Sequence, residues 1–270
     1  MTKVAFIGAG NMNSAVILGL INAGVSPSNI MVTNPSPEKR EKLAQTHGIL
    51  HTANNVEAAE FADFIVLGVK PHLITQVTND IANQIDVSQK CFISVAAGTT
   101  MAQIHQSLSG KGSVIRVMPN TPSQLGLGVS GMYACSQTTE QQKQVAQEIM
   151  QAVGIIKWLD AEAQIDDIIA VSGSGPAYFF LFMEAMETKA KALGFSDNEA
   201  RALVQQTALG AAQMVVENDI SIAQLRENVT SKGGTTQAAL NTFREGGLPE
   251  LVSSAMDSAI ARAKEMAQDS

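Results

Sequence analysis

Lys3-Val4-Ala5-Phe6-Ile7-Gly8-Ala9-Gly10-Asn11-Met12-Asn13 is the stretch that decides the fold of this chain. Its first five residues are mostly apolar and predict a short buried strand. Gly8 and Gly10 then permit a tight turn and a close approach of the backbone to a ligand. From Met12 to Ala23 the apolar residues recur at helical spacing. Strand, Gly-x-Gly turn and helix together form the context in which a dinucleotide pyrophosphate binds at a helix N-terminus.

Asn13 departs from the usual dinucleotide fingerprint, because it stands at the position of the third glycine. That glycine lets the helix pack closely on the strand, so the asparagine predicts a less close approach. A Gly-x-Gly pair also occurs in turns that bind nothing, and this stretch by itself leaves that alternative open.

Composition indicates a soluble globular protein of one large or two ordinary domains. The chain has 270 residues, of which 45% are hydrophobic and 16% charged. Its net charge of -7, without a basic patch, argues against nucleic acid as a partner. The start lacks a signal-peptide pattern, and we find no run long enough to span a membrane. We therefore expect a cytoplasmic protein that does not enter membranes.

Cysteine and histidine give no sign of a metal site. Cys91 and Cys135 are far apart in the sequence and lack metal-ligand spacing, so we expect buried small hydrophobes. The four histidines all lie in the first half, and none has a partner at a spacing typical of catalysis; they are His47, His51, His72 and His105.

Strands and helices are predicted to alternate in the N-terminal half. We expect strands at 3–7, 30–33, 64–69, 91–95, 114–117, 128–134 and 155–158, and helices at 12–23, 38–45, 73–83, 101–107 and 139–152. This alternation predicts a mostly parallel sheet covered on both faces, which is an α/β Rossmann domain over residues 1–160. Ligands bind such sheets at the carboxyl ends of the strands. That edge should carry Gly8, Asn34, Lys70, Ala97 and Asn120.

The end of the second predicted strand indicates the choice of cofactor. Rossmann domains that bind NAD usually place Asp or Glu there, whereas this chain has Thr33-Asn34-Pro35-Ser36-Pro37 followed by Lys39 and Arg40. No carboxylate repels a 2′-phosphate, and Asn34 and Ser36 can donate hydrogen bonds to one. The stretch favours NADP; the alternative is a polar turn that only caps the next helix.

Residues 161–270 are predicted to be all-helical. Ser172-Gly173-Ser174-Gly175-Pro176 should interrupt an early helix, and Ser196 with Glu199 forms a capping box. Tyr178 to Met183 is apolar on every side, which is typical of a helix buried all round. The other helices of this domain are too few to bury such a helix on all sides. We therefore expect a homodimer through this domain.

A second glycine-rich turn lies late in the chain, at Val229-Thr230-Ser231-Lys232-Gly233-Gly234-Thr235-Thr236. Successive backbone N–H groups in such a turn, ahead of a helix, can hold a small carboxylate. An ordinary helix start with a Gly-Gly turn explains the same pattern equally well.

Six motifs, in order along almost the whole chain, resemble those of the pyrroline-5-carboxylate reductase family. They are Phe6-Ile7-Gly8-Ala9-Gly10-Asn11-Met12, Val69-Lys70-Pro71, Ala96-Ala97-Gly98, Met118-Pro119-Asn120-Thr121-Pro122, Ser172-Gly173-Ser174-Gly175-Pro176-Ala177-Tyr178 and Gly233-Gly234-Thr235-Thr236. The resemblance implies reduction of 1-pyrroline-5-carboxylate to L-proline by NADPH or NADH, the last step of proline biosynthesis. It also implies a Rossmann domain, a helical domain that interlocks in a homodimer, and in some members a higher oligomer. Asn13 and Lys232 depart from the family pattern.

The same resemblance implies roles for individual residues. The pyrophosphate should lie against Ile7, Gly8, Ala9, Gly10, Asn11 and Met12, and the adenosine ribose with its 2′-phosphate near Asn34, Ser36 and Asn55. The nicotinamide half should be flanked by Val69, Lys70, Pro71, Ala96 and Ala97, with Asn228 reaching the cofactor from the helical domain. The substrate carboxylate should be bound by Ser231, Gly234 and Thr235. Thr236 should be catalytic at the ring nitrogen, with Asp219 a further candidate there.

Two other functions remain open on the sequence. A hydroxyacid dehydrogenase of similar plan could use Lys189 or Lys191 as its base, and a non-enzymatic NADP-binding regulator would need no base. The hydroxyl-rich Gly-Gly-Thr-Thr turn argues against both, because it suits a small carboxylate and supplies no oxidising base. A protonated cyclic imine accepts hydride readily, so a positioned hydroxyl and nicotinamide suffice for its reduction.

Overall fold

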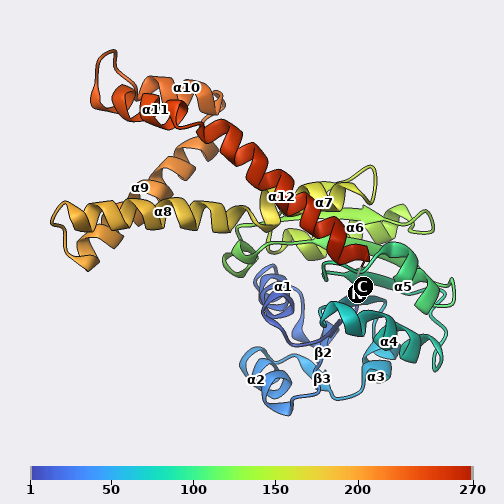
Figure 1. Ribbon diagram of the computed structural model, residues 1–270. Helices are drawn as coiled ribbons and strands as arrows, with labels where there is room; N and C mark the ends of the chain where they lie inside the picture. Colours follow the sequence, from blue (N-terminus) through green and yellow to red (C-terminus); the bar gives the residue numbers. More distant parts are fainter. Residues whose placement is uncertain (1, 269–270) are drawn as a thin grey trace. The chain divides into compact units, whose positions relative to one another are not determined.

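The computed structural model describes residues 2–268, and it divides into two compact units. The first unit runs to Ser174 and takes in the chain again from Ala259; the second unit is Gly175–Ser258. The boundary expected at residue 160 precedes this division because α7 (Gln164–Ile168) packs on strands of the first unit. Figure 1 shows the elements of both units along the chain.

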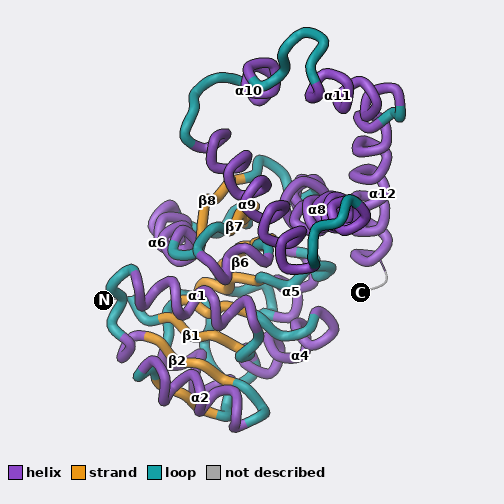
Figure 2. The backbone as a smooth tube through the Cα atoms, turned by 90° about the vertical axis from the view of Figure 1, so that its left-hand side faces the viewer, coloured by secondary structure: helices purple, strands orange, loops and turns teal. Residues whose placement is uncertain are grey.

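The first unit is built on an eight-stranded sheet in the order β3-β2-β1-β4-β5-β6-β7-β8. Each neighbouring pair of strands is parallel except β6 and β7, so the predicted mostly parallel α/β sheet is confirmed. Figure 2 shows strands of this sheet among the helices that cover them. The strands are β1 (Val4–Ile7), β2 (Ile30–Thr33), β3 (Leu50–Thr52), β4 (Phe64–Leu67), β5 (Cys91–Ser94), β6 (Ser113–Met118), β7 (Gly128–Ala134) and β8 (Gly154–Trp158).

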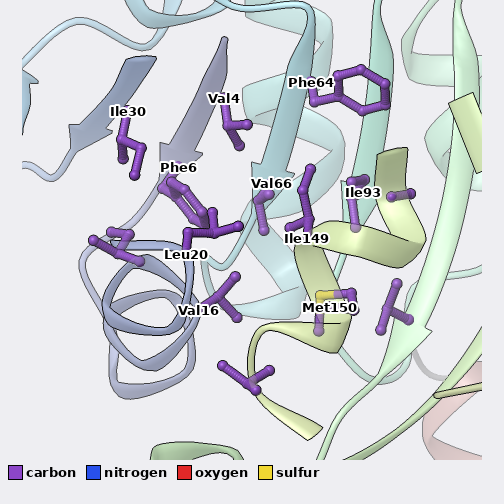
Figure 3. Packing of buried hydrophobic residues seen from close by; sticks show 14 of the residues in the cluster. Val4, Phe6, Val16, Leu20, Ile30, Phe64, Val66, Ile93, Ile149 and Met150 are labelled. Atoms are coloured by element: carbon purple, nitrogen blue, oxygen red, sulfur yellow. The ribbon is translucent and has the colours of Figure 1, made fainter. Parts of the chain in front are cut away.

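Helices cover both faces of the sheet because its central strands are apolar on both sides. On one face Phe6 and Val66 pack with residues of α1 and α6, among them Val16 and Ile149 (Figure 3). On the other face, residues of α3, α4 and α5 form a second buried cluster. The helices of this unit are α1 (Asn11–Asn22), α2 (Pro37–His47), α3 (Asn55–Phe61), α4 (Pro71–Ala82), α5 (Met101–Ser107), α6 (Glu140–Gln151) and α7, with 3-10 turns η1 (Pro27–Asn29) and η2 (Thr121–Leu125).

Two elements of the first unit have no counterpart in the sequence prediction. These are the short strand β3 and the helix α3, which follow one another between α2 and β4. Leu50 and His51 are exposed, and β3 pairs with β2 alone. An outermost strand of three residues lacks the buried apolar run by which we predicted the others.

The second unit is helical, as predicted. It contains α8 (Gly175–Ala192), α9 (Asp197–Val216), α10 (Ile222–Asn228), α11 (Thr235–Glu245) and the first part of α12 (Leu248–Gln268). The predicted capping box opens α9, since Ser196 N donates to Glu199 Oε2 at 2.9 Å. α8 packs on α9, and the ring of Phe182 contacts that of Phe243 on α11 with centroids 5.7 Å apart.

The interruption expected at Ser172–Pro176 is a widened helical turn. Ile169–Gly173 forms a π-helix, and α8 begins again at Gly175. Ser172 Oγ donates to the carbonyl of Ile168 at 3.1 Å, and Asn120 Nδ2 donates to the carbonyl of Ser172 at 3.0 Å. Side-chain bonds to the backbone therefore support a widened turn where the glycines alone predicted a break.

The expectation that no stretch is long enough to span a membrane is wrong. The helical stretch Gln164–Ala192 has 29 residues and meets the requirement by length and composition. A single such stretch is weak evidence for a membrane protein, because helices that pack inside soluble proteins meet the same requirement. The sequence does not predict this length because Ser172–Pro176 resembles a break in the helix.

Candidate functional site

The sheet has a topological switch point between β1 and β4, where the order of the strands reverses. In open α/β sheets the ligand crevice lies outside the carboxyl ends of the strands at that point. The turn Gly8–Gly10 follows β1, and Gly68–Pro71 follows β4. Two of the stretches expected to contact the cofactor thus meet at the place where this fold binds nucleotides.

The turn after β1 is shaped for close approach of a ligand. Gly8 has φ +99°, and a Cβ there would lie 2.8 Å from the carbonyl oxygen of Gly68, so no larger residue fits. Gly10 is the N-cap of α1 and offers no side chain to the helix start. The first N–H groups of α1 have no intrahelical partners, so they can bind an anion.

The residues predicted for the adenosine end lie together beyond β2. Asn34 Oδ1 accepts a hydrogen bond from Ala9 N at 3.1 Å, which ties this segment to the glycine turn. Thr33 Oγ1 donates to Asn55 Oδ1 at 2.6 Å, so Asn55 also lies at the end of β2. Ser36 is the N-cap of α2, and its side chain makes no capping bond.

Arg40 supports this segment and was not among the predicted site residues. Its Nη1 donates to the carbonyl oxygens of Asn34 at 2.9 Å and of Pro35 at 3.3 Å. The guanidinium therefore holds the loop that presents Ser36. The sequence offers one signal for this role, which is a basic residue in the first turn of the helix that follows β2, where the strand end lacks an acidic residue.

The segments predicted to flank the nicotinamide are joined to one another. Lys70 is the exposed N-cap of α4, and Pro71 is its first residue. Thr99 Oγ1 donates to the carbonyl of Pro71 at 3.4 Å, which connects the loop after β4 to the loop after β5. Ala96 and Ala97 lie in that second loop and are half-buried.

A cavity of about 430 Å³ opens beside Ala97 within the first unit. Glu162 anchors its wall, because its Oε1 accepts from Arg116 Nη1 at 2.6 Å and from Met101 N at 2.7 Å. The ion pair thereby joins β6 to the start of α5, which follows the Ala96–Ala97 loop. The lining residues are Ala97, Gly98, Thr100, Arg116, Met118, Glu162, Ala163, Asp166, Ile169, Ser174, Ala259, Arg262, Ala263 and Met266.

The charged residues of this cavity were missed in the sequence prediction. Arg116 lies within the otherwise apolar strand β6 and is buried, which is an uncommon place for arginine. Burial raises the pKa of the Asp166 carboxyl, and the nearby Arg116 and Lys264 oppose that rise. The charged Arg116 within a predicted buried strand was the one feature of the sequence that indicated this cavity.

The late glycine turn connects α10 to α11 in the second unit. Gly233 has φ +72°, which favours glycine, and Gly234 is the N-cap of α11 without a capping side chain. Gly234 N donates to the carbonyl of Ser231 at 3.0 Å, so the turn folds back on itself. Thr235 and Thr236 are the first two residues of α11, where free N–H groups and hydroxyls meet.

The remaining predicted residues of the second unit lie near this turn in sequence. Asn228 ends α10, and its Oδ1 accepts from Gln224 Nε2 at 3.0 Å. Asp219 is exposed between α9 and α10, and among the described residues no hydrogen bond joins it to Ser231 or Thr236. The structure brings Ser231, Gly234, Thr235 and Thr236 together, and leaves Asp219 on a separate segment.

The lysines that a hydroxyacid dehydrogenase would require are poorly suited as bases. Lys191 Nζ forms ion pairs with Glu187 at 2.8 Å and Asp197 at 3.2 Å. Its hydrogen bonds to these carboxylates raise the pKa of Lys191, which keeps it protonated. Lys189 lines an apolar hollow formed by α8, α9 and α11.

Thiol and metal chemistry find no support in the described residues. Burial raises the pKa of the Cys91 thiol to about 12, so it stays protonated. Cys135 is half-buried, and its Sγ accepts from Val114 N at 3.3 Å. No group of three or more His, Cys, Asp or Glu residues that could hold a metal occurs within residues 2–268.

Comparisons with known proteins agree with this arrangement. Residues 3–98 match a family described as "NADP oxidoreductase coenzyme F420-dependent", and residues 162–266 match "Pyrroline-5-carboxylate reductase dimerisation". A pyrroline-5-carboxylate reductase of Vibrio alginolyticus is 51% identical over 98% of this chain and 97% of its own length.

Two solved structures resemble the chain along its whole length. The enzyme of Coxiella burnetii is 41% identical with a TM-score of 0.94, and that of Plasmodium falciparum, determined with NADP bound, is 30% identical with a TM-score of 0.86. Each comparison covers 98% of both chains. Fold and site thus define a two-domain oxidoreductase with a nucleotide-binding Rossmann domain. The chain belongs to the pyrroline-5-carboxylate reductase family.

Proposed function

We propose that this chain reduces 1-pyrroline-5-carboxylate to L-proline, taking hydride from NADPH and, less readily, from NADH. The observation that carries the proposal is the position of the Gly8–Gly10 turn and the Gly68–Pro71 segment at the switch point of the sheet, in a chain of this family. The family resemblance supplies the substrate, and the geometry of the first unit supplies the place for the dinucleotide.

The residues of the first unit fit a dinucleotide. Gly8 leaves no room for a side chain, and Gly10, the N-cap of α1, has no side chain to bond the first N–H groups, which suits pyrophosphate binding. Ile7 to Met12 hold the pyrophosphate; Asn34, Ser36 and Asn55 surround the adenosine ribose; Val69, Lys70, Pro71, Ala96 and Ala97 flank the nicotinamide. Asn228 of the second unit adds a further contact. The bound dinucleotide supplies the hydride.

NADPH is the preferred donor because no carboxylate follows β2. Residues 33–37 are neutral, and Arg40 lies behind them with its Nη1 on the carbonyls of Asn34 and Pro35. The NADP bound in the Plasmodium falciparum relative and the description of the family matched by residues 3–98 both support this preference.

The turn before α11 binds the substrate carboxylate. Ser231 and Thr235 offer hydroxyl and N–H donors at a helix N-terminus, where the helix dipole favours an anion. Gly234, whose N–H bonds to Ser231 O, forms the turn between them. Thr236 donates to, or exchanges a proton with, the ring nitrogen and orients the carbon of the C=N bond toward the hydride. Asp219 is a further candidate near that nitrogen.

The enzyme acts in the cytoplasm as a homodimer that can join into larger assemblies of dimers, without a membrane or nucleic-acid partner. The description of the family matched by residues 162–266 supports dimerisation, as does the exposure of Phe179, Phe180 and Leu181 on α8. These large apolar side chains are covered when a second copy packs on them.

The proposal is tested by following NADPH oxidation by the purified protein with 1-pyrroline-5-carboxylate. We expect turnover that requires the imine, with L-proline as the product by chromatography. Oxidation of hydroxyacids without reduction of the imine would assign the chain to the dehydrogenases instead. Binding of NADPH without any turnover would assign it to a regulatory role.

A further inference from the structure

Asn13 is a buried polar residue that contacts the glycine turn after β1. It is the third residue of α1 and is 1% exposed. Its Nδ2 donates to the carbonyl oxygen of Gly8 at 2.8 Å and to that of Ile7 at 3.3 Å. A carboxamide buried at this depth costs free energy unless it is hydrogen-bonded. The two bonds satisfy Nδ2, whereas Oδ1 is buried without a hydrogen-bond partner among the described residues.

The same carbonyl of Ile7 also binds the segment after β4. Gly68 N donates to Ile7 O at 2.9 Å. Ile7 O is therefore shared by the Asn13 side chain and by the first residue of the Gly68–Pro71 segment. Three parts of the candidate site meet at one atom: the end of β1, the start of α1 and the end of β4.

Gly68 makes the room that Asn13 occupies. A Cβ on Gly68 would overlap the carboxamide of Asn13, closer than any real side-chain contact. In the dinucleotide fingerprint the small residue lies on the helix, at the position of Asn13. In this chain the larger residue, Asn13, is on α1, and the glycine, Gly68, follows the neighbouring strand β4. The helix and the strand can therefore pack closely, because the large and the small residue have exchanged places.

We propose that Asn13 is a positioning residue that fixes the phosphate-binding turn relative to the Gly68–Pro71 segment. One carboxamide thereby sets the distance between the groups that hold the pyrophosphate and those that flank the nicotinamide. This inference rests on the proposed function, because it assigns both segments to one dinucleotide. Hydride transfer is sensitive to such placement, since small displacements of the reacting atoms slow a reaction strongly.

The first test compares Asn13→Ala with Asn22→Ala, which removes the same side chain from the exposed far end of the same helix. For Asn13→Ala we expect the Kd for NADPH, measured by fluorescence without substrate, to rise about 5-fold or more. We expect kcat to fall by a similar factor while the KM for the imine stays within 2-fold. Asn22→Ala should leave all three constants within 2-fold.

A purely structural role for Asn13 predicts a different result. The melting temperature of Asn13→Ala would then fall, while Kd and kcat below that temperature would match those of the unaltered protein; this outcome overturns the proposal. The Kd for NADPH is measured without imine, so it tests Asn13 even if the chain does not reduce 1-pyrroline-5-carboxylate.

The second test uses the contact between Asn13 and Gly68, and its main measurement is the melting temperature. Gly68→Ala alone should clash with Asn13 and lower the melting temperature. Adding Asn13→Gly, which restores the usual fingerprint residue, should recover most of that loss and part of the NADPH affinity. Pairs in contact deviate from additivity in this way, whereas independent sites do not. Additive losses in the double variant would show that Asn13 and Gly68 do not oppose each other, and would overturn the inference.

Discussion

Thr236 is the side chain with the most direct chemical task in the proposed reaction. It is the second residue of α11 and is half-buried at the glycine turn. Thr236→Ala should lower kcat/KM for 1-pyrroline-5-carboxylate roughly 10-fold or more, which corresponds to about 1.4 kcal/mol of transition-state stabilisation. Steady-state kinetics at saturating NADPH measure this.

Thr242→Ala is the matched control for Thr236, because Thr242 lies on the same helix and its Oγ1 donates to the carbonyl of Ala238 one turn earlier. That variant should retain the unaltered kcat/KM. Equal constants for Thr236→Ala and the unaltered protein would remove Thr236 from the mechanism.

In the proposed function, Ser36 lies beside the 2′-phosphate of NADPH at the end of β2. Ser36→Asp places a carboxylate beside that phosphate, and like charges at such a distance repel. We expect the KM for NADPH to rise roughly 10-fold or more and that for NADH to change by less than about 3-fold. Ser28→Asp, at the opposite end of β2, should change neither. Equal losses with both cofactors would argue against a 2′-phosphate contact at Ser36.

The sequence predicts the place of a single residue in the sheet when that residue directly follows a strand. Asn34 was placed correctly at the carboxyl edge, since it directly follows a strand. Its bond to Ala9 N could not be predicted, because it depends on how two loops meet in space. Arg116 was detectable in principle as a charge in an apolar strand, but its partner Glu162 is 46 residues away.

At the scale of elements, Glu162 joins three segments of the first unit. Glu162→Ala would leave the buried guanidinium of Arg116 without its partner and Met101 N without an acceptor. The free energy of unfolding should fall by about 3 kcal/mol, because removing one partner of a buried ion pair leaves an uncompensated charge. Chemical denaturation measures the loss.

Glu148→Ala is the control for Glu162, because Glu148 accepts a hydrogen bond on the exposed face of α6. Surface changes of this kind usually stay within about 0.5 kcal/mol. A loss for Glu162→Ala no greater than that of Glu148→Ala would mean that the ion pair does not hold these segments together.

Helices and strands were predictable from the sequence where they contain an apolar run or a regular spacing of apolar residues. α5 and β7 were predicted at their observed bounds for this reason. β3 is three residues long and partly exposed, so its stability comes from pairing with β2 and not from its own pattern. The π-helix at Ile169–Gly173 has side-chain bonds from Ser172 and Asn120, which no local pattern reveals.

At the scale of the whole molecule, the apolar surface of α8 predicts self-association. Phe179 is 71% and Leu181 67% exposed in the single chain. The double variant Phe179→Glu/Leu181→Glu should sediment as a monomer at concentrations at which the unaltered protein is a dimer, because charges cannot be buried there without partners. Leu50→Glu, on the outermost strand, should remain dimeric. A monomeric unaltered protein would contradict the expectation.

The alternation of strands and helices along the sequence predicts only part of the architecture of the whole chain. The mostly parallel sheet and the helical second half both follow from that alternation. The antiparallel pairing of β7 with β6 does not, because it depends on η2 reversing the chain after Asn120. The return of the last residues to the first unit also has no local signal.

That return constrains how the protein is made. Residues from Ala259 onward belong to the same compact unit as the first strand, although the whole second unit lies between them in the sequence. A ribosome delivers the N-terminal half long before the segment that completes it. The nascent sheet must therefore wait for the end of α12 until synthesis has passed through every helix of the second unit.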